Sequence, residues 1–208
     1  MPARLKVPKE FEKMLQISMR DVLNYQEHEI GRPFIIEIKV PFESDKFLDD
    51  HRHFTKSNIN VCYAAPRNVG KPRDWYETQL NVTKAVRGQM GYPYKGIPFF
   101  AVTDDGYGFL AHTTSENNKQ FSAVGDELTL GRWLKNRLVE EGLIEPVKNT
   151  LEDTERKGMV TREILSQYGC NAISFQKTDM RMLNPEDERS SFEIWTLKLI
   201  SITEDDNG

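Results

Sequence analysis

Two segments of the chain are rich in side chains that can pair with nucleic acid. Residues 113–120, TTSENNKQ, end in two asparagines, a lysine and a glutamine, and residues 56–95 interleave Arg and Lys with Asn, Gln, Trp75 and Tyr76. Arginine and lysine can donate to guanine O6 and N7, asparagine and glutamine can pair with adenine, and the same cations neutralise phosphates. Both segments could equally be solvated loops, so the residue types alone leave the two readings open.

The charge of the chain is unevenly distributed. The 208 residues carry a net charge of -4, yet residues 52–95 hold eight Lys or Arg against two Asp or Glu, a balance of +6 that leaves -10 for the rest. An acidic chain does not coat nucleic acid or an anionic membrane with its whole surface. Any anion binding is therefore expected to be local.

A metal-dependent nuclease is the main alternative from a different class. Glu37 and Lys39 have the carboxylate-x-lysine spacing that, with an upstream residue such as Asp21, could hold Mg²⁺ and orient a water. Asp21 falls within a helical pattern, however, whereas such an aspartate normally heads its own strand. No histidine is followed two residues later by lysine, so the phospholipase D-type nuclease signature is absent.

Other chemistry has little support in the sequence. Cys62 and Cys170, the only cysteines, have no metal-ligand or redox spacing, as in a reduced cytosolic protein. No apolar run approaches the roughly 18 residues of a membrane span, and the N-terminus lacks the apolar stretch of a signal peptide. We therefore expect a cytoplasmic protein with no cofactor, no metal and no membrane partner. A third reading is a protein-interaction module whose basic face meets an acidic partner.

The hydrophobic pattern predicts three helices. An apolar stripe with helical spacing runs over residues 8–25. Asp126 occupies an N-cap position of a second helix that Gly142 ends, and Thr161 and Gly169 bracket a third. The core is expected to include Leu130, Trp133, Leu134, Leu138 and Trp195.

Apolar runs with strand character fill the rest of the chain. Asp104-Asp105-Gly106 between two alternating runs predicts a hairpin, because the turn needs residues that tolerate positive φ. The expected strands are 34–40, 58–64, 76–82, 97–103, 107–113, 171–177 and 192–202. Such a set, with helices at the ends, is typical of a mainly β or α+β fold built on an antiparallel or half-open barrel.

The succession of motifs is similar to that of a known family. FFAVTDDGYGFLAHTTSENNKQFSAVGDELTLGRWLKNRL, then VTREILSQYGCNAISFQKT, then FEIWTLKL resembles the C-terminal DNA-recognition domain of NgoFVII-type restriction endonucleases. That group includes NgoAVII and, more distantly, BfiI, and its recognition domain is akin to the effector domain of EcoRII. The resemblance covers about residues 56–200.

The resemblance implies a seven-stranded open pseudobarrel of the plant B-three type, with capping helices and here an extra N-terminal helix. It implies a wrench-like mode of binding, in which two loops that project from one side of the barrel contact the major groove of double-stranded DNA. We call these loops the first arm, residues 58–75, and the second arm, residues 112–120. The candidate DNA-binding residues are Lys56, Asn58, Asn60, Arg67, Asn68, Lys71, Arg73, Trp75, Arg87 and Lys95, and then His112, Thr114, Glu116, Asn117, Asn118, Lys119 and Gln120. Arg132 and Lys135 are further candidates for phosphate contact.

The resemblance also sets expectations for organisation and partners. Residues 51–203 are expected to form the recognition domain, residues 1–50 an added helix and first strand, and residues 204–208 a frayed tail. In the family a nuclease domain precedes the recognition domain, whereas this chain begins with its own Met and helix. We therefore expect no catalysis in this chain and a separate nuclease domain or subunit as partner.

Overall fold

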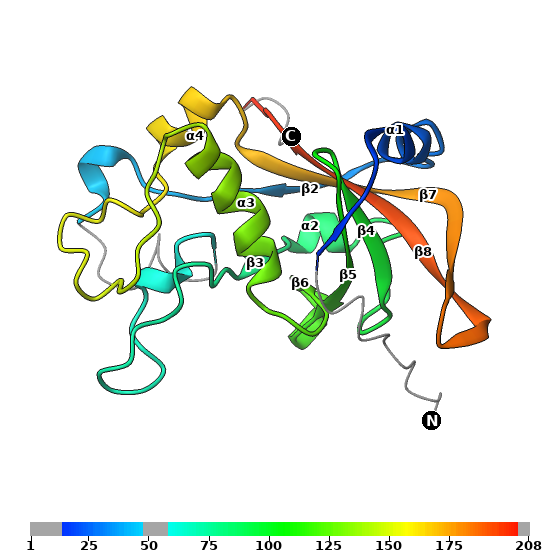
Figure 1. Ribbon diagram of the computed structural model, residues 1–208, viewed down its shortest axis with the longest axis horizontal. Coiled ribbons are helices and arrows are strands. Elements are labelled where there is room, and N and C mark those ends of the chain that lie inside the picture. Colours follow the sequence, from blue (N-terminus) through cyan, green and yellow to red (C-terminus); the bar gives the residue numbers. More distant parts are fainter. Residues whose placement is uncertain (1–13, 48–57, 204–208) are drawn as a thin grey trace. The chain divides into compact units, whose positions relative to one another are not determined.

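The computed structural model describes residues 14–47 and 58–203 (Figure 1). The chain divides into two compact units, each assembled from separate segments. The first unit comprises residues 1–35, 83–126 and 174–198, and the second comprises residues 36–82, 127–173 and 199–208. The domain boundary predicted near residue 50 and the tail predicted at 204–208 lie outside the described residues.

A single sheet dominates the described residues. It holds eight strands, of which seven follow one another along one path and β1 (Leu15–Gln16) pairs with β5 off that path. The path runs β2-β7-β8-β4-β5-β6-β3, and β4, β5 and β6 lie wholly within the first unit. The mainly β, barrel-like fold predicted from the sequence is thereby confirmed.

The central hairpin of the first unit forms where the Asp-Gly signal predicts it. β4 (Phe99–Thr103) and β5 (Tyr107–Thr114) pair antiparallel with Phe99 opposite Ala111, and Gly106 in the turn has φ +89°. β5 continues through a loop into β6 (Gln120–Ala123), with Thr114 opposite Gln120. On its other edge β4 pairs parallel with β8, Phe100 lying opposite Ile194, so the sheet is mixed and not purely antiparallel.

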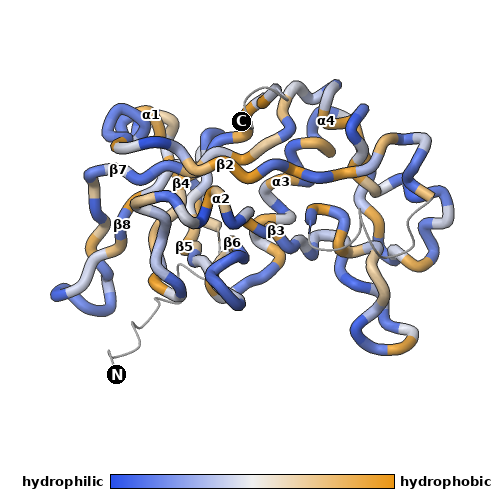
Figure 2. Tube along the Cα trace, turned by 180° about the vertical axis from the view of Figure 1, so that it is seen from behind, coloured by the Kyte–Doolittle hydropathy of each residue, from blue (hydrophilic) through white to orange (hydrophobic). Residues whose placement is uncertain are grey.

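β7 (Ala172–Asn184) and β8 (Asp187–Ile200) are longer than predicted and form an extended hairpin (Figure 1). Figure 2 shows the tip of this hairpin as predominantly hydrophilic. β2 (Phe34–Glu37) pairs with β7 and completes the path at that end.

The first helix is shorter than predicted. α1 spans Met19–Glu27 and begins at Ser18, whose Oγ accepts from the backbone N–H of Asp21 at 3.1 Å. Leu15 and Gln16 form β1 instead of a helical turn, and the part of the predicted helix before residue 14 lies outside the described residues. The serine cap overrides the apolar periodicity because it offers the first turn a hydrogen-bond acceptor.

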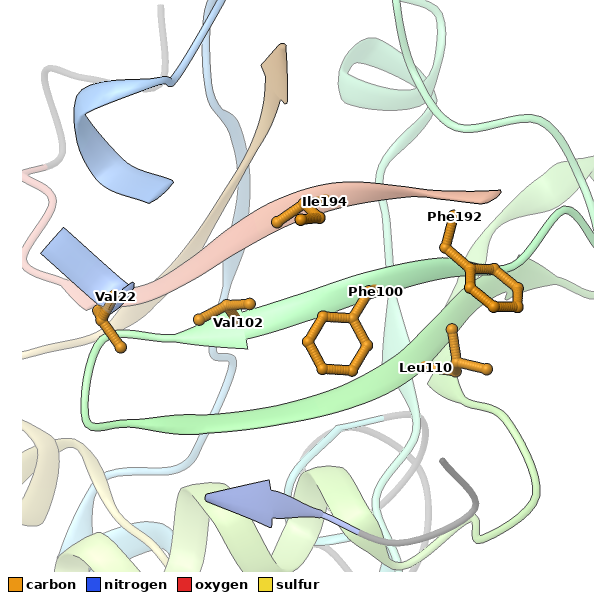
Figure 3. Packing of buried hydrophobic residues seen from close by; sticks show 6 residues of the cluster. All are labelled: Val22, Phe100, Val102, Leu110, Phe192 and Ile194. Carbon is orange, nitrogen blue, oxygen red and sulfur yellow. The ribbon is translucent and has the colours of Figure 1, made fainter. Parts of the chain in front are cut away.

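Apolar side chains of α1, β4, β5 and β8 form one core cluster (Figure 3). Val22 of α1 packs there with Phe100, Val102 and Leu110, each at most 2% exposed. The full cluster is Val22, Phe100, Val102, Leu110, Phe192 and Ile194. Burying these side chains stabilises the unit by about 1.5–3 kcal/mol per residue relative to exposure.

A second group of apolar side chains in the first unit is aromatic. Phe175 and Trp195 lie 5.8 Å apart between ring centroids, and Phe99 packs against both Trp195 and Phe121. Trp195 is 1% exposed, which confirms its predicted place in the core.

The second unit carries two of the predicted helices and fewer strands than expected. α3 (Thr129–Glu140) ends as predicted at Gly142, whose φ is +68°, but it begins after Leu128 and not at Asp126. α4 (Arg162–Tyr168) has the predicted Thr161 cap and ends at Gly169 in the left-handed conformation. The predicted core residues Leu130, Trp133, Leu134 and Leu138 are all 2% exposed.

Two predicted strands of the second unit are wrong in whole or in part. Residues 58–64 form no strand, because the side chain of Asn58 accepts from the backbone N–H of Asn60 and starts a turn that continues as the 3-10 helix η3 (Val61–Tyr63). Of residues 76–82 only Leu80–Asn81 are extended, as β3. The unit also contains the 3-10 helix η2 (Glu43–Asp45).

Candidate nucleic-acid interface

The second arm is a tight loop between β5 and β6 with an unusual backbone. Ser115, Asn117 and Asn118 have φ of +67°, +55° and +57°, and the 3-10 helix η4 (Glu116–Asn118) is broken at Asn117. Asparagine tolerates the left-handed region, but Ser115, with ψ 179°, lies in a region that is essentially restricted to glycine. Each such residue costs about 1–3 kcal/mol and persists only where its surroundings impose it.

Hydrogen bonds hold this backbone in place. Asn118 Nδ2 donates to the Pro93 carbonyl at 2.7 Å, and the Tyr92 hydroxyl donates to the Asn118 carbonyl at 3.2 Å. The Ser115 hydroxyl donates to Gln120 Oε1 at 2.7 Å across the mouth of the hairpin. The backbone N–H of Gly96 donates to the Thr113 carbonyl at 2.8 Å, so residues 92–96 and the second arm form one rigid assembly.

The amide run of the second arm therefore divides into two roles. Asn118 is tied to Pro93 and shapes the loop, whereas Asn117 and Glu116 are exposed. Lys119 and Gln120 are half-buried, as are Thr114 and His112 of β5. Burial lowers the pKa of His112, which keeps the imidazole neutral at pH 7.

The first arm is a long loop of the second unit that projects from η3 (Figure 1). At its tip Asn68, Gly70 and Lys71 are exposed, Gly70 has φ +76°, and the backbone N–H of Lys71 donates to the Asn68 carbonyl at 3.2 Å. Because only glycine adopts this φ freely, Gly70 permits the sharp reversal that presents Lys71 to solvent.

One carboxylate organises the two arginines of this loop. Glu77 Oε1 accepts from Arg67 Nη2 and from Arg73 Nη1, each at 2.6 Å. Arg73 also donates from Nε to the Ala65 carbonyl at 3.0 Å, and its side chain is 17% exposed, whereas that of Arg67 is 61% exposed. Arg73 thus closes the loop, while Arg67 keeps most of its guanidinium in solvent.

Three predicted residues of the first arm lie in the core of their unit. Asn60 is fully buried and its amide bonds the backbone of Val160 twice, donating to the carbonyl at 2.8 Å and accepting from the N–H at 3.0 Å. Trp75 is 3% exposed and its Nε1 donates to the Gly158 carbonyl at 2.8 Å. Asn58 is 5% exposed. These side chains have structural partners, and we do not carry them into the interface.

The remaining predicted residues have different surroundings. Lys95 is exposed and follows the exposed Tyr94, and Arg87 is half-buried at the end of α2 (Lys84–Arg87). Lys56 lies outside the described residues. Lys135 of α3 is fully buried, with Nζ 3.4 Å from Cys62 Sγ and 4.8 Å from the centroid of the Trp75 ring, so it does not reach phosphate in this structure.

Sequence reasoning missed the exposed apolar side chains beside Lys95. Met90 is 100% exposed and Tyr94 is 84% exposed. The sequence of residues 88–96, GQMGYPYKG, sets apolar residues between glycines without any acidic residue, but it does not reveal which of them are exposed.

The residues proposed for a metal-dependent nuclease contact other side chains of the protein. Asp21 accepts from the Ser18 hydroxyl at 2.6 Å in the cap of α1, and Glu37 lies 3.8 Å from Lys39 Nζ. Among residues 14–47 and 58–203, no group of three His, Cys, Asp or Glu side chains could hold a metal ion. In the same ranges, no helix is long and apolar enough to cross a membrane.

Comparison with known proteins places the chain in a family. No curated protein matches the sequence. A family model described as the NgoFVII C-terminal B3-like DNA-binding domain matches residues 32–179, which is more than half of the chain and includes β2. The chain therefore belongs to the family of the NgoFVII C-terminal B3-like DNA-binding domain.

Proposed function

We propose that this chain binds a specific sequence of double-stranded DNA through the major groove, as the non-catalytic recognition part of a restriction endonuclease. The observation that carries the proposal is the second arm, where strained backbone and hydrogen bonds present Asn117 and Lys119 at a fixed loop. Family membership supports DNA as the partner, and a nuclease domain or subunit would supply the cleavage.

The second arm suits base reading because its geometry is set before binding. The Asn118 and Ser115 side chains occupy internal hydrogen bonds, so the exposed Asn117 amide stands on a backbone that does not need to be ordered by DNA. An asparagine amide can donate to adenine N7 and accept from adenine N6, and each good bidentate pair discriminates against a wrong base by about 1–3 kcal/mol. We assign base contact to Asn117 and phosphate contact to Lys119.

The first arm suits phosphate contact. Lys71 at the tip is a flexible point charge, and Arg67 keeps donors free of Glu77 in a side chain that is 61% exposed. Phosphate contacts fix the register of a protein on the duplex without reading sequence. Arg73 acts through the shape of the loop and not by touching DNA.

The test begins with selection from a randomised duplex pool at about 0.1 M salt without metal, followed by titration of the selected and scrambled duplexes. We expect a short motif bound about 10³-fold or more tightly than the scramble. An unenriched pool would refute sequence-specific recognition. Adding Mg²⁺ to the selected duplex then tests for cleavage, and cleavage by this chain that Glu37→Ala abolishes would refute the non-catalytic role.

Two variants test the assigned roles on the selected duplex. Lys119→Ala should weaken binding to selected and scrambled duplexes alike and lower the slope of log K against log salt by about 0.9. Asn117→Ala should weaken only the selected duplex, by roughly 5–150-fold, and leave the slope unchanged. Lys148→Ala, which removes an exposed lysine outside both arms, is the matched control and should change neither quantity.

A further inference from the structure

A pocket of about 680 Å³ opens beside the second arm, within the first unit. Its floor includes Trp195 and Phe99 from the aromatic part of the core, and its rim includes Met90, Tyr94 and Lys95. Asn118 of the second arm is also part of the lining. None of the functions assigned above uses this pocket.

Apart from Lys95, the rim of the pocket carries exposed apolar side chains on a segment that hydrogen bonds hold in place. Met90, Tyr94 and Ile97 are 100%, 84% and 53% exposed, so three large exposed hydrophobic side chains fall within eight residues. The hydrogen bonds of Pro93 and Gly96 to the second arm fix the segment that carries them. A cluster of exposed apolar side chains on an ordered segment is typical of a binding site.

The polar groups of the pocket favour a ligand that has a hydrogen-bond donor on its ring and a separate, negatively charged group. Asn118 lines the pocket, and its Oδ1 is buried and has no hydrogen-bond partner in the described structure. Lys95 lies on the rim, and residues 83–103 contain three Lys or Arg and no Asp or Glu. The one carboxylate of the lining, Glu193, is paired with Lys177 at 2.5 Å.

We propose that this pocket takes one nucleotide of the bound duplex, turned out of the base stack. The base lies against Tyr94 and Met90 and donates its amino group to Asn118 Oδ1, and Lys95 binds the adjoining phosphate. The inference rests on the proposed function, because the nucleotide belongs to bound DNA. A base leaves the stack most readily where it is mispaired, so a mismatch at that position strengthens binding.

The experiment places 2-aminopurine at each position of the selected duplex in turn and measures its fluorescence with the full chain. We expect one position to brighten severalfold on binding, and a mismatch there to tighten binding about tenfold. Tyr94→Ala should abolish both effects. Leu183→Ala is the control, because it also removes a large exposed apolar side chain, 71% exposed against 84% for Tyr94, but outside the pocket. It should change neither the brightening nor the effect of the mismatch.

The outcomes separate this inference from the proposed function. Tight, specific binding with no brightening at any position overturns the extrahelical nucleotide and leaves the proposed function standing. Absence of specific binding overturns both. A further experiment titrates the protein with adenosine or cytidine monophosphate. If either nucleotide binds saturably and Tyr94→Ala removes this binding, while no duplex position brightens, the ligand is a free nucleotide and the claim about duplex DNA is wrong.

Discussion

Arg67 and Arg73 donate to the same oxygen of Glu77, yet their substitutions should impair different properties, DNA binding for Arg67 and stability for Arg73. Arg73→Ala removes the hydrogen bond to Glu77 Oε1 and the one to the Ala65 carbonyl, both in a region where Arg73 and Glu77 are 17% and 11% exposed. A shielded ion-paired bond contributes about 1.5–3 kcal/mol, and the bond from the guanidinium to a backbone carbonyl, which the exposed Ala65 leaves open to competing water, is taken at about 0.5–1.5 kcal/mol. We expect Arg73→Ala to lower the free energy of unfolding by roughly 2–4 kcal/mol, which lowers Tm by about 5–15 °C in a chain of this size.

Arg67→Ala is the matched comparison because it removes the other partner of the same oxygen. Its side chain is 61% exposed, so the lost pair with Glu77 contributes at most about 1 kcal/mol and the looser one with the exposed Glu127, at 3.8 Å, adds little. Urea unfolding measures the two stabilities, and DNA titration at several salt concentrations measures the loss of phosphate contacts. We expect Arg67→Ala to weaken DNA binding at nearly unchanged stability. Equal stability losses in the two variants, or an unchanged Tm in Arg73→Ala, would contradict the roles assigned to these arginines.

Three further predictions concern single sites. Asn118→Gly keeps the left-handed φ, whereas Asn118→Ala adds about 1–2 kcal/mol of backbone strain, so thermal unfolding should rank Gly above Ala although both lose the bond to Pro93. Burial raises the pKa of Tyr92 to about 12, so between pH 10 and 12 this tyrosine is ionised in the unfolded chain but protonated in the folded protein. The free energy of unfolding should therefore fall over this pH range. Tyr92→Phe should reduce the fall, as measured by urea unfolding at alkaline pH. Gly131→Ala should destabilise α3 by at least about 3 kcal/mol, because the new Cβ would lie 1.7 Å from the Tyr76 carbonyl oxygen; urea unfolding measures this loss against the exposed Glu140→Ala, which should cost little.

Elements with a local cause were predictable from the sequence. The β4–β5 hairpin follows from an Asp-Gly turn, and α4 follows from a threonine cap and a terminal glycine, so both lie where they were predicted. The predicted helix start at Asp126 and the strand at 58–64 were wrong. In the second case the Asn58 side chain starts a turn by accepting from the backbone N–H of Asn60, and the Asn60 amide holds that turn through two hydrogen bonds to the backbone of Val160, a hundred residues further on.

In the candidate site, too, only the features with a local cause were predictable from the sequence. The sequence indicates which loops are basic and amide-rich, but it does not distinguish Asn117 from Asn118 or Arg67 from Arg73. Those distinctions depend on partners elsewhere in the chain, the Pro93 carbonyl for Asn118 and the Ala65 carbonyl for Arg73. The apolar rim of the pocket escaped notice because exposure, and not residue type, makes Met90 and Tyr94 unusual.

The parallel pairing of β4 with β8 has a consequence for how the chain folds. Phe100 and Ile194 lie 94 residues apart in sequence, whereas the β4–β5 and β7–β8 hairpins need only short turns. Loop closure makes the distant pairing slow, so we expect the hairpins to form first and their union to limit the folding rate. Stopped-flow refolding should then show Ile194→Ala slowing refolding more than Leu110→Ala does for an equal loss of stability. Until that union, the edge of β4 that later receives β8 stays open to other chains, which makes high protein concentration the main hazard during refolding.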